Sequence, residues 1–348
     1  MKFLVVALAL PLAFHALTLK GSAKISDEAR KLSGKELVDY VNSVQSAWTA
    51  KLNPRFAAYP DKVKQKLMGV KNIAVPMEYR VNEVDTILDG VPASFDGRVQ
   101  WGAMCPSVKN IRDQSSCGSC WAFGAAEAMT DRTCIASQGK FTDPLSADDI
   151  LACCGFSCGD GCEGGYPIEA WQFWVHKGVV TGGSYQSKSG CMPYPFAPCE
   201  HHTNATHYQP CPGQIYPTPK CQKQCQSGYA NQYSQDKHYG SSAYSVSSKV
   251  AAIQSEVYAN GPVEVAYEVY EDFEHYTGGV YVHTAGQLLG GHAVKLLGWG
   301  TDSASGLDYW LIANSWNEDW GENGYFRIVR GRDECGIESG VVAGKPKV

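Results

Sequence analysis

The sequence predicts an α+β protein in which a mostly helical leading segment precedes a body with one helical part and one β-rich part. Three observations carry this prediction. Residues 18–90 lack cysteine and place apolar side chains at helical spacing. Residues 91–230 combine one Ala-rich helix with a stretch rich in cysteine, glycine and proline. Residues 250–345 contain short runs of Val, Ile and Tyr with glycine between them, which is typical of strands.

Residues 1–17 are predicted to be a signal peptide. Lys2 supplies a positive charge, and an apolar run from Phe3 to Phe14 follows it. A run of roughly 12 residues has the length of a signal-peptide core and is too short to span a membrane. A buried core helix is the alternative. No later segment is a continuous apolar run of about 18 residues, so we expect a soluble protein, secreted or delivered to lysosomes.

The charge pattern points to no particular class of partner. The net charge of −5 is small for 348 residues, and no run of basic residues is present. We therefore expect no nucleic-acid partner, and the lack of a long apolar run after the signal peptide predicts no membrane partner.

The fourteen cysteines are more informative. None precedes Cys105, and ten lie between Cys134 and Cys225. With a signal peptide, such a cluster predicts a disulfide framework. The alternative is a zinc site formed by the cysteines of residues 153–162 with the histidines of 201–202. These spacings do not specify tetrahedral ligand geometry, so we expect no metal and no cofactor.

The leading segment is predicted to contain a helix. Ser33 is a candidate N-cap, and Glu36 follows it at the capping-box spacing. The apolar side chains that recur at helical spacing are Leu32, Leu37, Val38, Val41, Val44 and Trp48.

The strongest helix signal begins beside Cys120. A Gly-containing turn at residues 117–121 leads into an Ala-rich run as far as Met129, so we expect a largely buried helix whose first turn carries Cys120. Unpaired N–H groups and the helix dipole favour a thiolate at that position. A neighbouring imidazolium would lower the thiol pKa further. Cys120 is therefore the candidate nucleophile.

Two possible partners of Cys120 lie far along the chain. His292 begins an apolar strand and Asn314 ends another. An asparagine can accept a hydrogen bond from an imidazole and fix its tautomer. A lone histidine on a strand is usually a packing or surface residue, and His292 is singled out because Cys120 and Asn314 accompany it. The predicted strands are Val263–Tyr270, Gly279–His283, His292–Trp299, Tyr309–Ala313 and Tyr325–Val329.

These segments resemble the papain family of cysteine proteases. Residues 117–121 match the C-G-[SA]-C-[WY] signature of papain and the cathepsins, and the wider segment 114–123 extends the likeness. The resemblance implies a two-domain papain-like fold, with a helical left domain, a β-barrel-like right domain and the active site in the cleft between them. A mostly helical propeptide would precede it.

The resemblance also implies roles for four residues. Cys120 would be the nucleophile, His292 the general base and acid, and Asn314 the orienting residue. Gln114 would donate its side-chain amide to the oxyanion together with the N–H of Cys120. Ser115 stands where the family usually has glycine, which affects the geometry of this loop. A non-catalytic homologue usually lacks the nucleophile, and a disulfide-rich structural protein would not need these segments.

An insertion is predicted between the nucleophile and its partners. In the family the histidine and asparagine follow the cysteine by roughly 130–150 residues, and here roughly 20–40 more are present. The cysteine-rich segment 191–225, with its core at 199–211, resembles the occluding loop of cathepsin B-like enzymes. Residues 91–96, 158–167 and 235–240 resemble other parts of those enzymes.

The occluding loop implies an exopeptidase. A disulfide-closed flap would stop a long chain from passing, and His201 and His202 would bind the terminal carboxylate of a peptide. The enzyme would then remove C-terminal dipeptides; endopeptidase activity alone is the alternative. Asp113, Asp319 and His201 are available to tether the flap, but residues 203–210 contain no arginine. We therefore expect a weakly held flap that opens as pH rises.

Further site residues follow from the resemblance. Gly340 follows Cys335–Ser339, where cathepsin B has an acid, so we expect a preference for apolar or aromatic residues two positions before the scissile bond. Asn204 begins an N-glycosylation sequon. The other implied substrate-binding residues are Gly164, Gly165, Tyr166, Pro167, Ala293 and Trp316. The implied disulfides are Cys105–Cys134, Cys117–Cys162, Cys153–Cys221, Cys154–Cys158, Cys191–Cys225 and Cys199–Cys211, which leave Cys120 and Cys335 free.

The resemblance assigns residues 18–90 to an inhibitory propeptide and residues 91–348 to the mature peptidase. Residues 48–50 and Phe56 resemble the short cathepsin B prosegment; a separate binding domain is the alternative. The implied partners are peptide and protein substrates, the propeptide itself and cystatin-type inhibitors, with a monomeric mature enzyme. Residues 309–322 also resemble a pattern of cathepsin B-like digestive proteases in blood-feeding worms.

Overall fold

The computed structural model describes residues 25–53, 56, 59–80, 83–200 and 207–348. The predicted signal peptide, His201, His202 and Asn204 lie outside the described residues. Across the described part of the chain, no helix has both the length and the apolar character needed to cross a bilayer.

The leading segment, residues 25–90, is helical with one short strand. The helix α1 begins after Ser33, as predicted, but the Ser33 side chain makes no capping hydrogen bond. Trp48 is not part of this helix: it lies in β1 (Trp48–Ala50), which pairs with β7 (Tyr276–Tyr281), because its indole is buried against the sheet. The described elements of this segment are η1 (Ala29–Lys31), α1 (Gly34–Val44), β1 (Trp48–Ala50), α3 (Asp61–Leu67) and α4 (Met77–Arg80).

The helical half of the body is built around α6 (Cys120–Ala136). Every residue from Cys120 to Cys134 is buried, as expected for an Ala-rich helix surrounded by packed elements. Its buried charges are paired: Asp131 accepts from Lys295 Nζ at 2.9 Å, and Arg132 bonds Glu256 at 2.8 Å. The other elements of this half are α5 (Gly97–Trp101), η2 (Pro106–Lys109), α7 (Ala147–Cys153), η3 (Gly161–Glu163) and α8 (Pro167–Lys177).

The other half is a strongly curved sheet whose strand order is β1-β7-β10-β9-β8-β6-β11-β5, with β2 (Phe95–Asp96) on β8. Hydrogen bonds define an open path between β1 and β5 in the described residues, so the predicted barrel-like domain is not a closed barrel. Its strands are β5 (Gly240–Ser245), β6 (Val263–Tyr270), β7 (Tyr276–Tyr281), β8 (Leu288–Thr301), β9 (Asp308–Ala313), β10 (Tyr325–Val329) and β11 (Gly340–Pro346).

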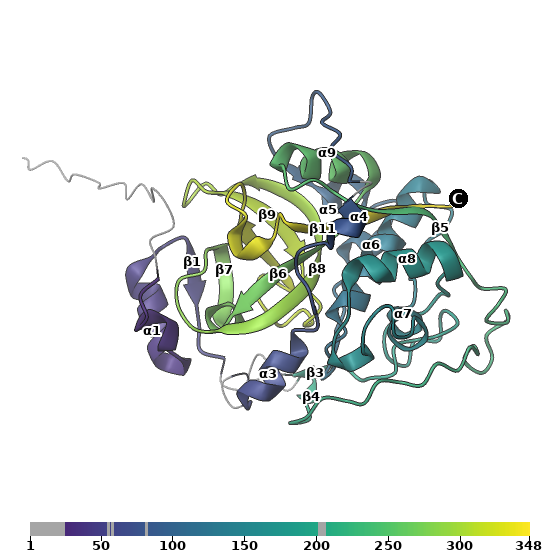
Figure 1. Cartoon of the computed structure of the whole chain (residues 1–348), viewed down its shortest axis with the longest axis horizontal. Coiled ribbons are helices and arrows are strands. Elements are labelled where there is room, and N and C mark those ends of the chain that lie inside the picture. Colours follow the sequence, from purple (N-terminus) through teal and green to yellow (C-terminus); the bar gives the residue numbers. More distant parts are fainter. Residues whose placement is uncertain (1–24, 54–55, 57–58, 81–82, 201–206) are drawn as a thin grey trace, which may run out of the picture.

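All five predicted strands are present. The helix α9 (Val250–Asn260) and the strands β5 and β11 of this half were not predicted from the sequence, nor were α5, α7 and α8 of the helical half. The helix α6 packs against β8, so the two halves meet along the element that carries Cys120 and the strand that carries His292. Figure 1 shows the helices α6, α7 and α8 on one side and the curved sheet on the other, with α1 and β1 at the outer edge beside β7.

Six disulfides form at the six pairs that the resemblance implies. The four cysteines of the zinc alternative are all among them. Cys120 and Cys335 are the free cysteines. The disulfide Cys199–Cys211 closes the flap, whose short strands β3 (Cys199–Glu200) and β4 (Gln209–Pro210) pair with each other.

Candidate active site

Cys120 is the first residue of α6 and is fully buried. Burial raises the pKa of its thiol to about 12, although the backbone N–H groups of Ala293, Gly69 and Trp121 hydrogen-bond the sulfur and lower the pKa. Ala293 belongs to β8 and Gly69 to the leading segment. The thiol is therefore enclosed by both halves of the body and by the leading segment, and it stays protonated at neutral pH in this state.

His292 lies in β8, directly before Ala293, and is also fully buried. Its Nε2 lies 2.8 Å from Asn314 Oδ1, the same atom that accepts the backbone N–H of Ser315 at 2.8 Å. Because a backbone N–H only donates, Oδ1 is the acceptor for both, and His292 carries its proton on Nε2. His292 Nδ1 has no hydrogen-bond partner among the described residues.

The surroundings keep this imidazole neutral. Burial lowers the pKa of His292 to about 4, and the hydrogen bond to Asn314 opposes the shift. The indole of Trp316 covers the ring, with centroids 4.9 Å apart. Asn314 follows the last residue of β9, and its backbone N–H donates to the carbonyl of Gly324 at 2.9 Å, so both ends of the pair are held by the sheet.

Gln114 is held in place by Ser315. Its backbone N–H donates to the Ser315 carbonyl at 2.9 Å, and its Oε1 accepts from Ser315 Oγ at 2.9 Å. Its Nε2 is therefore turned to carbonyl groups: it donates to Cys117 O at 2.8 Å and to Leu67 O at 3.0 Å. Sequence reasoning missed Ser315, although its place directly after Asn314 was the available signal.

Ser115 adopts the left-handed backbone conformation, with φ of 56°, at the position where the family usually has glycine. Its N–H donates to Asp113 Oδ1 at 2.6 Å, which supports a conformation that a non-glycine residue rarely takes. Serine in place of the usual glycine at position 115 is therefore accommodated in the left-handed backbone conformation of the loop that carries Gln114.

The leading segment passes through the cleft as an extended chain. Gly165 N–H donates to Gly69 O at 2.8 Å from the helical half, and Val70 N–H donates to Gly291 O at 2.9 Å on the sheet half. The fit is so close that a Cβ on Gly69 would lie 1.9 Å from the carbonyl oxygen of Gly118. The predicted substrate-binding residues Gly164 and Gly165 thus contact the leading segment in this state.

An apolar recess lies beside this chain. Its walls include the predicted residues Tyr166, Pro167 and Gly340, and Ile73 of the leading segment also lines it. A Cβ on Gly340 would come within 2.6 Å of Ile73 O. The nearby acid Glu338 is turned away, because its carboxylate accepts hydrogen bonds from Trp310 Nε1 at 2.9 Å and from the backbone N–H groups of Gly331 and Asp333.

The base of the flap is fixed next to Gln114. Asp113 Oδ2 accepts from the Cys199 N–H at 3.2 Å and from Asn317 Nδ2 at 3.0 Å, and Asn317 Nδ2 also donates to Cys199 O. Burial raises the pKa of Asp113 to about 6. Farther along the flap, His207 Nδ1 lies 3.1 Å from Asp319 Oδ2. Asp319 was predicted from the sequence as a tether residue, but His207, which lies in the arginine-free segment 203–210, was not.

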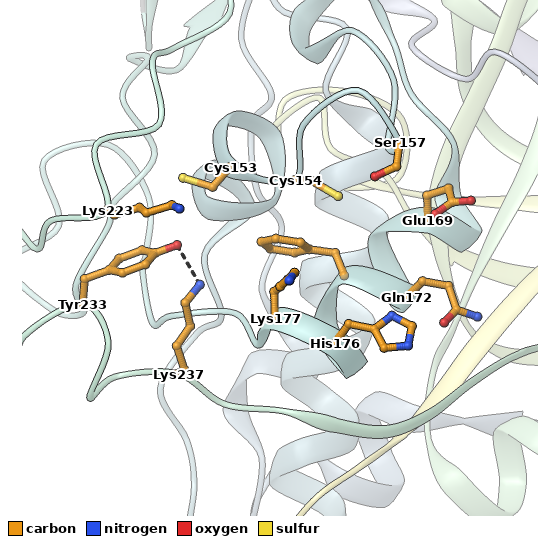
Figure 2. A pocket seen from close by; sticks show the side chains of 11 residues that line it. Cys153, Cys154, Ser157, Glu169, Gln172, His176, Lys177, Lys223, Tyr233 and Lys237 are labelled. Carbon is orange, nitrogen blue, oxygen red and sulfur yellow. Dashed lines mark hydrogen bonds between the residues drawn. The ribbon is translucent and has the colours of Figure 1, made fainter.

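A second cavity, of about 400 Å³, lies on the helical half away from Cys120, between α7, α8 and the chain around residues 223–237 (Figure 2). Lysine side chains line it, but the most buried of them, Lys237, is bound internally. Its Nζ donates to Asp149 Oδ2 and to Tyr233 OH, both at 2.7 Å. This cavity therefore has a structural ion pair at its wall.

Comparison with known proteins agrees with this geometry. The model of the papain family of cysteine proteases matches residues 91–345, and the chain belongs to that family. It is a cysteine peptidase of the cathepsin B-like type: it is 57% identical to cathepsin B-like cysteine proteinase 6 of Caenorhabditis elegans over 93% of this chain and 86% of that protein. It is 54% identical to a gut-specific cysteine proteinase of the same species, over 91% and 92% of the two chains.

A solved structure supports the same assignment. Procathepsin B S9 from Trypanosoma congolense superposes with a TM-score of 0.76 and 34% identity, covering 90% of this chain and 98% of that one. The leading segment therefore corresponds to a region that is present in a proenzyme structure.

Proposed function

We propose that Cys120, His292, Asn314 and Gln114 hydrolyse peptide bonds through a thioester. Once the leading segment leaves the cleft, Nδ1 of His292 takes the thiol proton and the sulfur attacks the scissile carbonyl carbon. The amide nitrogen departs with the proton returned by His292. A water molecule, deprotonated by the same imidazole, then hydrolyses the thioester and regenerates the thiol.

The observation that carries this proposal is the position of the Cys120 sulfur against Ala293 N–H, beside a histidine whose Nδ1 lacks a partner among the described residues. Gln114 Nε2 already holds a backbone carbonyl, that of Leu67, at 3.0 Å. The same donor, with the Cys120 N–H, would stabilise the oxyanion of a substrate.

Labelling of the mature enzyme by a thiol-alkylating peptide epoxide tests the proposal. We expect one label, on Cys120, and its loss in Cys120→Ser together with hydrolysis. Cys335→Ser removes the other free cysteine and is the matched control, which should keep both. Hydrolysis by Cys120→Ser at the native rate would point to the alternative of a different nucleophile, and absence of hydrolysis in the native chain to a non-catalytic binding homologue.

Residues 18–90 are proposed to be the inhibitory propeptide and residues 91–348 the mature peptidase. Support comes from the extended stretch of the leading segment, which occupies both walls of the cleft, and from the family match that begins at residue 91. We propose a secreted or lysosomal enzyme acting on peptides and proteins, monomeric when mature, with cystatin-type proteins as inhibitors and a glycan at Asn204.

Peptidyl-dipeptidase activity is proposed to come from the flap, with His201 and His202 binding the terminal carboxylate. The His207–Asp319 contact supports a pH-dependent balance, because His207 pairs as a cation only when protonated. A histidine tether holds the flap less firmly than an arginine would, and we propose that the flap opens as pH rises, with dipeptide release dominant in acid and internal cleavage near neutral pH. Endopeptidase action alone is the alternative.

The ratio of dipeptide release to internal cleavage of one long peptide, followed between about pH 4 and 7 where histidine titrates, tests the tether. We expect the ratio to fall with rising pH in the native chain. In His207→Arg it should stay level, since arginine keeps its charge. His176→Arg, at an exposed position of α8, is the matched control. A ratio that does not change with pH in the native chain contradicts the proposal.

A further inference from the structure

A buried histidine of the sheet half lies beneath the propeptide. His275 ends η4 (Glu271–His275) and is 2% exposed. The propeptide backbone bonds it twice: Lys51 N–H donates to its carbonyl oxygen at 2.9 Å, and Asn53 N–H donates to its Nδ1 at 3.3 Å. Because a backbone N–H only donates, Nδ1 is unprotonated and the imidazole is neutral while the propeptide is docked.

Charged groups surround this ring. Lys64 of the propeptide is buried and lies 3.6 Å from Glu271 and 3.6 Å from Glu274. Burial lowers the pKa of His275 to about 4; the charge of Lys64 adds to this shift and that of Asp272 opposes it. Two oxygens of Asp272 are already bonded to Tyr281 and to backbone N–H groups. The other charged groups that line this interface are Arg30, Lys31 and Asp61.

A cavity of about 360 Å³ reaches the same place. It lies between η1, α3 and η4, and its walls include both Lys64 and His275. A proton can therefore reach the histidine from solvent before the propeptide has moved.

We propose that His275 is the acid sensor that releases the propeptide. When His275 Nδ1 takes up a proton from solvent, it becomes a donor and can no longer accept the Asn53 N–H. The protonated ring also places a second positive charge beside Lys64. The contact between residues 51–53 and η4 then opens. This inference rests on the proposed inhibitory role of residues 18–90.

The direction of the pH dependence follows from the pKa of His275 with the propeptide docked and with the propeptide released. The pKa of His275 is about 4 with the propeptide docked, against an ordinary value of 6.5 once the ring is exposed. Docking is therefore favoured above pH 6.5 and weakens as pH falls toward 4. The contribution of His275 alone should raise the opening equilibrium about 20-fold from pH 7 to pH 5 and about 100-fold from pH 7 to pH 4.

The neighbouring carboxyl groups act in the opposite direction. Burial raises the pKa of Glu271 and of Glu274, so these groups take up protons more readily in the docked state. Their titration favours docking in acid. Of the groups named around this contact, His275 is the one whose protonation favours release.

Hydrogen exchange on the full-length Cys120→Ser proenzyme, which cannot process itself, measures opening at the amides of Lys51 and Asn53. His275→Asn removes the titration and leaves an oxygen acceptor near the position of Nδ1. The ratio of exchange rates between the native residue and His275→Asn, taken at each pH, cancels the intrinsic pH dependence. We expect this ratio to rise about 20-fold from pH 7 to pH 5. His176→Asn, at an exposed position of α8 in the helical half of the body, should leave exchange at Lys51 and Asn53 unchanged.

Direct titration of the His275 ring by NMR keeps the test independent of the variant's folding. We expect a pKa near 4 in the proenzyme, as the docked geometry gives, and an ordinary value after the propeptide is removed. An ordinary pKa in the proenzyme, or the same pH dependence in His275→Asn as in the native chain, overturns the proposal. Neither measurement needs catalysis. A result against the His275 sensor therefore leaves the proposed peptidase chemistry unaffected, and a result against that chemistry leaves the sensor unaffected.

Discussion

Two stretches of the propeptide contact the body in different ways. Residues 67–71 lie in the cleft, where they are held mainly through backbone hydrogen bonds to Gln114, Gly165 and Gly291. Residues 48–53 lie at the far edge of the sheet, where Trp48 is buried against two tyrosines. The first stretch covers the thiol, and the second buries the large Trp48 side chain against the sheet. Residues 67–71 therefore block the active site, whereas residues 48–53 hold the propeptide on the body.

The largest expected effect on propeptide docking comes from a substitution in residues 48–53. Trp48 is 3% exposed, its ring lies 5.1 Å from that of Tyr281, and its Nε1 donates to Val282 O at 2.9 Å. Trp48→Ala should destabilise propeptide docking by about 3–5 kcal/mol. Calorimetric unfolding of the Cys120→Ser proenzyme measures it. Val44→Ala, half-exposed on the same segment, should change little. Equal effects of the two variants would contradict an anchor at Trp48.

The next effect is at the cleft. Gly69→Ala places a methyl group 1.9 Å from the Gly118 carbonyl oxygen, so the chain must shift at a cost of about 1–3 kcal/mol. The unprocessed proenzyme should then hydrolyse a small fluorogenic peptide on the order of 10–100 times faster than the native proenzyme. Gly213→Ala, where a Cβ meets nothing, is the control. A silent Gly69→Ala proenzyme would show that close packing at Gly69 is not needed for inhibition.

A smaller effect concerns specificity. Gly340→Glu adds an acid to the apolar recess and should raise the ratio of Arg-Arg to Phe-Arg hydrolysis about 10-fold in the mature enzyme, since a charged hydrogen bond contributes about 1.5–3 kcal/mol. Gly340→Gln has the same size without the charge and should leave that ratio low. If the native enzyme already prefers Arg-Arg, the assignment of this recess is wrong.

The smallest effect is at the surface. Lys66 pairs with Glu163 at 2.8 Å, but both side chains are 46% exposed. Lys66→Ala should weaken docking by less than about 1 kcal/mol. Titration of inhibition against salt concentration checks it, and a loss comparable to that of Trp48→Ala would show that this surface ion pair holds the propeptide as firmly as the buried Trp48 does.

Local chemistry predicted much of this molecule. The Ala-rich run after Cys120 specifies α6 because such a run has high helix propensity and can be buried all round. The strands at Val263–Tyr270 and Tyr325–Val329 have the bounds predicted from their Val and Tyr content. The position of Trp48 was not predictable, because its helical spacing from Leu37 continues a real pattern and only the partner strand β7, far along the chain, takes it out of the helix.

The missed parts depend on contacts between distant residues. His207 meets Asp319 across the flap, and no local pattern links the two. His275 matters because Asn53 lies above it, a contact that spans most of the chain. The helix α9 was missed because its Val and Ala content resembles that of the strands around it.

We infer that the Cys120 thiol is neutral while the propeptide covers it and ionised once the propeptide has left. The most direct test of this inference is the rate of Cys120 alkylation by iodoacetamide against pH, before and after propeptide removal, in a Cys335→Ser background. In the proenzyme, where burial raises the pKa of Cys120 to about 12, we predict little reaction at pH 7 and an increase only at strongly alkaline pH. After removal, reaction should be fast below pH 7, as expected beside a histidine at a helix N-terminus. Equal rates in the two forms would contradict the account.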